Sequence, residues 1–151
     1  LLKPIPHVMT FGWGAFIRED YEYLSRKGLG DYFHQMEQTH DMARAIKGVD
    51  VVVMPSRWEA CGLLAMEVLA AGKPLIGSDC IGLREVLKGT PARAIENGSS
   101  DSLVDALTQE FEHLSEHKRA AEDYQNVAVK RFNIRRPARE LRSLYQNLAR
   151  C

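Results

Sequence analysis

The stretch of sequence that decides the fold runs from residue 49 to residue 74 and reads VDVVVMPSRWEACGLLAMEVLAAGKP. Val49 to Met54 predicts a strand buried on both faces, because three consecutive valines are typical of a central parallel strand. Pro55 ends that strand, and the segment from Cys61 to Ala71 predicts a helix that Gly72 terminates. A strand that leads directly into a helix predicts one unit of a parallel sheet.

The same alternation of strand and helix continues on both sides of this stretch. We expect further strands at residues 7–11, 31–36, 75–78 and 92–95, and further helices at residues 18–27, 41–47 and 82–88. Thr39 is the expected N-cap of the helix at 41–47. Strands that alternate with helices form parallel pairs, and the helices cover both faces of the sheet. The pattern therefore predicts an α/β, Rossmann-like three-layer αβα fold with a parallel sheet for residues 8–96.

The last third of the chain, residues 97–151, predicts helices without strands. A loop at residues 97–100 precedes a helix that begins at Asp101. The apolar face of this helix carries Leu103, Leu107, Phe111 and Leu114. Pro137 suits the first turn of a final helix. That helix carries an apolar stripe at helical spacing, formed by Leu141, Leu144, Tyr145 and Leu148. We expect the stripe to pack against the sheet or a neighbouring domain.

Length and composition limit the class of protein. A chain of 151 residues predicts one domain, residues 1–151. The 20 Lys and Arg residues balance the 20 Asp and Glu residues, which argues against a nucleic-acid binder that works through bulk charge. No apolar run approaches the roughly 18 residues that a membrane helix needs.

The cysteines and the first residues bear on where the protein works. Cys61, Cys80 and Cys151 form no CxxC motif and leave one thiol unpaired, so we expect a reducing, cytoplasmic compartment. The chain begins at Leu1 without a Met or a signal-peptide pattern, and we expect it to start inside a longer protein.

The loop between the strand at 49–54 and the helix at 61–71 is where we expect a ligand. Loops at the carboxyl ends of parallel strands hold ligands in open α/β sheets. A helix N-terminus offers unpaired N–H groups and a positive dipole end, which suit a phosphate. Gly62 would let the ligand approach the backbone without a Cβ in the way.

Glu67 is an unusual residue in an otherwise apolar helix. A carboxylate among so many apolar neighbours costs free energy unless it is hydrogen-bonded. Either Glu67 lies on the single strip of the helix that faces solvent, or its carboxylate points into the cleft and accepts the hydroxyls of a ribose, as acidic residues do in dinucleotide sites. The residues alone favour neither interpretation.

A wider pattern resembles a known family. The motif P-S-x-x-E-x-x-G-L-x-x-x-E-x-x-A-x-G-x-P begins at Pro55, and G-L-R-E-V follows at residues 82–86. This combination resembles the donor-site signature of the group 1 glycosyl transferases of the GT-B fold. Their hallmark is two glutamates with seven residues between them, here Glu59 and Glu67. The resemblance extends from about Val8 to Leu148 and implies that the chain is the C-terminal, donor-binding half of such an enzyme.

The resemblance implies a role for each matching position. Glu67 would hold the ribose hydroxyls of a nucleoside-diphosphate sugar, and Glu59 would act as the catalytic group that faces the transferred sugar. Backbone N–H groups would bind the diphosphate and the sugar at Cys61, Gly62, Leu63 and Leu64. Gly12 and Gly14 match the Gly-x-Gly loop at the floor of the cleft. The family reaction transfers a hexose or similar sugar to an acceptor, commonly with retention and without a metal or other cofactor.

The chain departs from the family pattern at several points. The resemblance implies an N-terminal acceptor domain and a first donor-domain strand, carrying an Arg and a Lys that clamp the diphosphate, and we expect both to lie outside this chain. We therefore expect this chain alone to be inactive. Cys80-Ile81-Gly82 stands where a Gly-Gly pair is common, and Cys61 where an aromatic residue is common.

Other interpretations remain open. The chain could be a non-catalytic α/β binding domain, or an enzyme of the same fold such as a sugar-nucleotide 2-epimerase.

The H-x-x-E-H motif at residues 113–117 matches inverted zinc peptidases, but no third ligand is evident and we expect a solvated helix face. The basic residues at 130–131 and 135–136 predict a solvated turn. A lipid-linked acceptor would instead bring the parent enzyme into peripheral contact with a membrane. The base, the sugar and the acceptor leave no clear side-chain signature.

Overall fold

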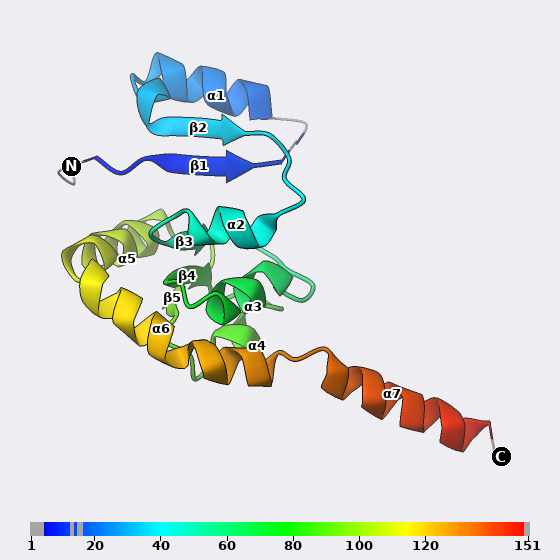
Figure 1. The fold of residues 1–151 in the computed structure, drawn as a ribbon. Helices are drawn as coiled ribbons and strands as arrows, with labels where there is room; N and C mark the ends of the chain where they lie inside the picture. Colours follow the sequence, from blue (N-terminus) through cyan, green and yellow to red (C-terminus); the bar gives the residue numbers. More distant parts are fainter. Residues whose placement is uncertain (1–4, 13, 15–16, 150–151) are drawn as a thin grey trace. The chain divides into compact units, whose positions relative to one another are not determined.

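The computed structural model describes residues 5–12, 14 and 17–149, and these residues form two compact units, Leu1–Ala45 and Ile46–Cys151 (Figure 1). Each unit is described by itself. A short helix, α2 (Met42–Lys47), spans the boundary in the sequence. The assignment of residues 1–151 to one donor-binding domain stays a prediction.

The first unit is a small α/β layer. Strands β1 (Val8–Phe11) and β2 (Phe33–Met36) pair in parallel, with Val8 opposite Phe33. Helix α1 (Ile17–Arg26) joins them, and a short 3-10 helix at Gly30–Tyr32 occupies the part of the expected strand that precedes β2. The hydroxyls of Thr10 and Tyr21 lie 2.6 Å apart and tie β1 to α1.

The N-cap of α2 differs from the prediction. The Asp41 carboxylate accepts a hydrogen bond from the Arg44 N–H at 3.0 Å, which is the geometry of an N-cap. The Thr39 hydroxyl accepts from the Asp41 N–H at 3.1 Å, one step outside the helix. The prediction of Thr39 was wrong because both side chains can cap, and the chain begins its helical turn at the later one.

The second unit contains a three-stranded parallel sheet in the order β3-β4-β5, formed by Val52–Met54, Leu75–Ser78 and Arg93–Ile95. Helices α3 (Leu63–Ala70) and α4 (Arg84–Leu87) make the crossovers. Three more helices follow β5: α5 (Ser100–Glu112), α6 (Leu114–Arg131) and α7 (Arg135–Leu148). The alternation of strand and helix thus confirms the α/β class and the parallel pairing.

Both faces of this sheet are covered, as adjacent residues of β4 show. Ile76 is fully buried against Ile95 and against Ala106 of α5. A Cβ added at Gly77 would lie 3.1 Å from the Leu87 side chain of α4, on the opposite face. Because successive side chains of a strand point to opposite faces, α5 and α4 lie on opposite sides of the sheet. The second unit therefore has the expected three layers.

Helix α7 departs from the expectation that its apolar stripe is packed. Every described residue from 133 to 149 is exposed, including Leu141, Leu144, Tyr145 and Leu148 at half or more of their surface. The helix forms, with Pro137 in its first turn as predicted. Its apolar face is left without a partner among the described residues, so the prediction of packing against the sheet was wrong, and packing against a neighbouring domain stays a prediction. No helix in the described part of the chain is both long and apolar enough to cross a membrane.

Candidate functional site

Three loops of the second unit meet at the carboxyl ends of its parallel strands. They follow β3, β4 and β5 and cover residues 55–62, 79–83 and 96–99. The Glu59 N–H donates to the Ile81 carbonyl at 3.3 Å, which joins the first loop to the second. Asn97 joins the third loop to the first, because its side-chain amide donates to the Arg57 carbonyl at 3.0 Å. This edge of the sheet is where an open α/β fold binds ligands.

Two glycines let these loops approach closely. Gly82 has φ +88°, and a Cβ there would lie 2.1 Å from the carbonyl oxygen of Glu59. Gly62 has φ +50°, and its Cβ would lie 2.7 Å from the Leu83 side chain. The space that the missing Gly62 Cβ leaves is filled by protein. We expected Gly62 to leave space for a ligand, and that explanation was wrong. A glycine is required here because a Cβ would collide with Leu83.

Helix α3 begins at Leu63, two residues later than predicted, and presents a free N-terminus. The backbone N–H groups of Cys61, Gly62, Leu63 and Leu64 donate to no acceptor among the residues that the structure describes. Unpaired N–H groups and the helix dipole at this end of α3 favour negative charge. Four such donors at the end of a parallel strand can receive the oxygens of a phosphate or diphosphate.

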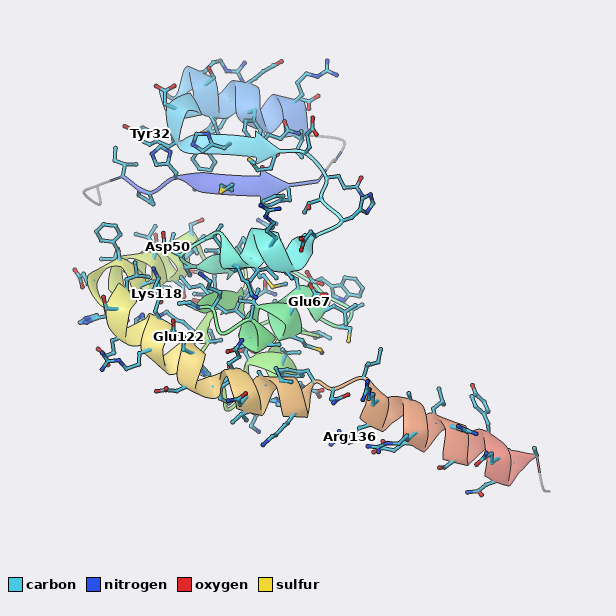
Figure 2. The ribbon with its side chains drawn as sticks, in the orientation of Figure 1. Tyr32, Asp50, Glu67, Lys118, Glu122 and Arg136 are labelled. Atoms are coloured by element: carbon cyan, nitrogen blue, oxygen red, sulfur yellow. The ribbon has the colours of Figure 1, made fainter. Side chains whose placement is uncertain are left out.

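The two glutamates of the motif have different surroundings. Glu59 is half-buried, and its Oε1 accepts a hydrogen bond from the Ser56 hydroxyl at 2.9 Å. Glu67 lies on α3 and is exposed (Figure 2), so its carboxylate bears no burial cost that a hydrogen bond would have to offset. Its exposure removes the argument from buried charge, and the ribose-binding role of Glu67 stays a prediction.

Large apolar side chains are exposed around the Glu59 loop. Trp58, Leu63 and Ile81 each expose about two thirds of their surface, at 68%, 66% and 70%. They come from the loop after β3, from the start of α3 and from the loop after β4. Exposed apolar side chains grouped at a polar site are typical of a ligand-binding or protein-binding surface.

Gly12 and Gly14 belong to the first unit, whereas the other predicted site residues belong to the second. Gly12 has φ +108°, a conformation that favours glycine, and it follows β1 directly. Trp13, between the two glycines, lies outside the described residues. The structure places most of the other predicted site residues in the loop after β3 and at the start of α3: Glu59, Cys61, Gly62, Leu63 and Leu64.

Two residues that support the loop, Ser56 and Asn97, were not predicted from the sequence. For Ser56 a local signal existed, since the hydroxyl of a serine three residues before a glutamate can donate to its carboxylate. Asn97 is 40 residues from the carbonyl that it contacts, and no sequence signal points to that pair.

The H-x-x-E-H motif has a structural role. His117 Nδ1 lies 2.7 Å from a carboxylate oxygen of Glu110, which is buried, so this part of the helix is less solvated than expected. The described residues contain no group of three or more His, Cys, Asp or Glu side chains that could hold a metal.

One member of the basic pairs also differs from the solvated turn that was expected. The Arg131 guanidinium donates to the Glu85 carbonyl at 2.7 Å and to the Lys88 carbonyl at 3.0 Å, and so holds the C-terminal end of α4.

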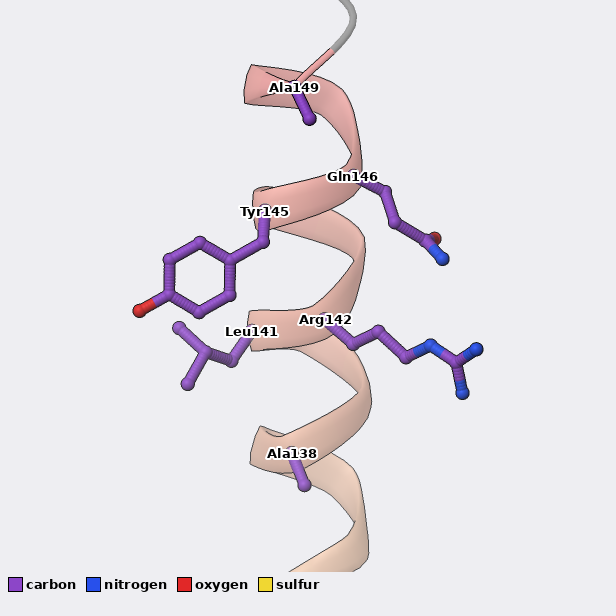
Figure 3. A pocket seen from close by; sticks show the side chains of 6 residues that line it. All are labelled: Ala138, Leu141, Arg142, Tyr145, Gln146 and Ala149. Carbon is purple, nitrogen blue, oxygen red and sulfur yellow. The ribbon is translucent and has the colours of Figure 1, made fainter.

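A shallow hollow on α7 (Figure 3) is a weaker candidate for a site. Leu141 and Tyr145 lie on one side of the helix, and Arg142 and Gln146 on the other. All lining residues come from this single helix and its cap: Ala138, Leu141, Arg142, Tyr145, Gln146 and Ala149. A hollow without a second wall cannot enclose a ligand, so the functional site is better placed at the Glu59 loop.

Comparisons with known proteins find glycosyltransferases that are similar to this chain. The chain is 25% identical over 139 residues to the lipopolysaccharide core biosynthesis mannosyltransferase LpsB of Rhizobium meliloti, covering 90% of this chain and 40% of LpsB. It is 35% identical over 91 residues to a D-inositol 3-phosphate glycosyltransferase of Paenarthrobacter aurescens, covering 60% of this chain and 19% of that protein. The chain thus spans less than half the length of these curated relatives.

Solved structures show the same fold. Anabaena Alr3699/HepE in complex with UDP-glucose matches with a TM-score of 0.87 at 19% identity, over 95% of this chain and 42% of that one. Sucrose-phosphate synthase from Thermosynechococcus elongatus also gives 0.87, at 22% identity, over 97% of this chain and 39% of that one. The sequence pattern of the family described as "Glycosyl transferases group 1" matches residues 3–113. The chain therefore belongs to the group 1 glycosyl transferases and has the fold of GT-B glycosyltransferase domains.

Proposed function

We propose that this chain binds the nucleoside-diphosphate sugar in a glycosyltransferase that transfers the sugar to an acceptor, with retention and without a bound metal. The observation that carries the proposal is the free N-terminus of α3, where four backbone N–H groups lack an acceptor among the described residues, beside the loop that holds Glu59. The family membership of the chain supports the same assignment.

The chemistry of the transfer fits these groups. Negative charge develops on the diphosphate as the bond to the sugar breaks, and preorganised N–H donors stabilise such charge without reorganising. We propose that the donors from Cys61 to Leu64 have this function. Glu59 would face the sugar near its reacting carbon. Glu67, on helix α3, would accept hydrogen bonds from the ribose hydroxyls.

A uridine nucleotide is the first donor to test. Similar solved structures of Anabaena HepE hold UDP-glucose or UDP, although at 18–19% identity these structures show the fold alone. The named relatives include mannosyltransferases, so the base and the sugar should be tested together. Because the chain spans 40% of LpsB, we propose donor binding for this chain and expect transfer only in a longer protein.

The test is a thermal-shift and calorimetric screen against UDP, GDP and ADP and their glucose or mannose derivatives. Glu67→Ala is run beside Glu122→Ala, which removes another exposed glutamate, from the middle of α6 (Figure 2). We expect one base to stabilise the chain, and Glu67→Ala to weaken its binding about tenfold or more, as expected for lost hydrogen bonds to a charged group. Glu122→Ala should bind normally.

Two results would contradict the proposal in different ways. Equal affinities of the Glu67→Ala and Glu122→Ala variants would remove the ribose assignment alone. A chain that binds none of these nucleotides or nucleotide sugars would contradict donor binding and favour a non-catalytic α/β domain.

A further inference from the structure

We propose that Ser56 and Asn97 are positioning residues that hold the loop at residues 55–61, so that the Glu59 carboxylate keeps one orientation toward the donor sugar. This inference rests on the proposed function, because it assigns a task to Glu59 in sugar binding. Ser56 acts on the side chain of Glu59, and Asn97 acts on the backbone that carries it.

Ser56 fixes the carboxylate. Its hydroxyl donates to Glu59 Oε1 at 2.9 Å in a partly buried position, and hydrogen bonds to a carboxylate are stronger than those between neutral groups. A glutamate side chain without such a partner samples several rotamers. The other carboxylate oxygen, Oε2, accepts no hydrogen bond from the described residues and is free to meet a sugar hydroxyl.

Asn97 fixes the backbone from a different element. Its amide nitrogen donates to the Arg57 carbonyl at 3.0 Å, two residues before Glu59. The turn that carries Asn97 is itself ordered, because the Ser99 N–H donates to the Glu96 carbonyl at 3.1 Å. A side chain that follows β5 thus restrains the loop that follows β3.

The two restraints act together with a third. The Glu59 N–H is bound by the Ile81 carbonyl at 3.3 Å, so the loop is held at residue 57, at residue 59 and at the Glu59 side chain. A purely local role for Ser56 would explain its contact with Glu59. It would not explain why Asn97, 40 positions from Arg57 in the sequence, binds the Arg57 carbonyl. Groups that bind a ligand gain affinity when they are fixed before it arrives.

The experiment measures how much the sugar adds to binding. Calorimetry gives the dissociation constants of a nucleotide and of its sugar derivative. The pairs are UDP with UDP-glucose, GDP with GDP-mannose and ADP with ADP-glucose, and the pair that binds best is used. The variants are Ser56→Ala, Ser56→Thr and Asn97→Ala, with Asn126→Ala as the control, because Asn126 is exposed on α6. Thermal denaturation and circular dichroism establish that each variant is folded.

We expect Ser56→Ala and Asn97→Ala to reduce the sugar's contribution to affinity about fivefold to tenfold while nucleotide affinity changes less than twofold. Ser56→Thr, which keeps the hydroxyl, should restore the contribution. Amide hydrogen exchange of residues 57–61 should accelerate in the two alanine variants and remain unchanged in Asn126→Ala. These readouts separate positioning from general stability.

Three results would overturn the inference. If folded Ser56→Ala and Asn97→Ala retain the full contribution of the sugar, the proposed function survives and the positioning role is wrong. If nucleotide and nucleotide-sugar affinities fall equally, the residues act on stability alone. If the unmodified chain binds none of the probes, the proposed function and the inference fail together.

Discussion

Replacing Gly82 by alanine should displace the Glu59 loop, because the two backbones are in contact. A Cβ at Gly82 would lie 2.1 Å from the Glu59 carbonyl oxygen and 2.7 Å from its carbonyl carbon. Real Cβ contacts are essentially never shorter than 3.0 Å, so the backbones of Gly82 and Glu59 must separate by about 0.9 Å. The clash is with backbone, which has no flexible end that could rotate away.

The expected loss has two parts. Alanine at the φ of +88° found at Gly82 is strained by about 1–2 kcal/mol. The displacement adds to this, because the groups of a binding site must be held within about 0.5 Å of their productive positions. We expect Gly82→Ala to lower the free energy of unfolding by more than the strain alone and to abolish the contribution of the donor sugar to binding.

Gly89→Ala is the matched control for this variant. Gly89 has a similar backbone conformation, with φ +71°, and a Cβ there would meet nothing within 4 Å. Urea denaturation of both variants separates the strain from the clash, and calorimetry with a nucleotide and its sugar derivative measures the effect on the site. Equal losses of stability in the two variants, with the sugar's contribution intact in Gly82→Ala, would refute the reasoning.

Two further predictions concern contacts that hold the second unit together. Arg131→Ala should lower the free energy of unfolding by about 0.5–1.5 kcal/mol, because it removes two exposed hydrogen bonds to carbonyls at the end of α4 that water can partly replace; urea denaturation beside Lys130→Ala checks this, and equal losses would contradict it. The Lys118 ammonium hydrogen-bonds to Asp50 and lowers the pKa of this carboxyl, so the pair stabilises the fold at neutral pH and loses this effect as pH falls through the lowered pKa. Asp50→Asn should therefore cost no more than about 1 kcal/mol at neutral pH, since Asp50 is largely exposed, and progressively less as the pH falls through the lowered pKa or as salt is added. Unfolding curves from neutral to strongly acidic pH test this, and a difference that stays constant with pH would rule it out.

Local patterns in the sequence predicted most elements of the fold. The valine run predicted β3, and the alternation with helices predicted parallel pairing, because only crossovers through helices join parallel strands so compactly. Element ends were less predictable. Helix α3 begins at Leu63 because Gly62 adopts a left-handed conformation for its contact with Leu83, and that contact lies outside the local pattern.

The candidate site divides in the same way. Its motif residues lie on one continuous stretch and could be found from spacing alone. Their supports could not, because Asn97 and Gly82 reach the loop only after β3, β4 and β5 have been placed side by side. The contacts of Arg131 with α4 and the burial of Glu110 likewise depend on how α4, α5 and α6 pack.

By itself, the sequence determined the class of fold, the strand-to-loop-to-helix unit at residues 49–74 and the family. These follow from periodicity and from residue types that are close along the chain. The tertiary structure decided which glycines are required by packing, which side chains hold Glu59, and that the stripe on α7 has no partner among the described residues. Such features depend on contacts between residues that are far apart in the sequence. Bringing these residues together costs loop entropy, and only the folded state offsets that cost.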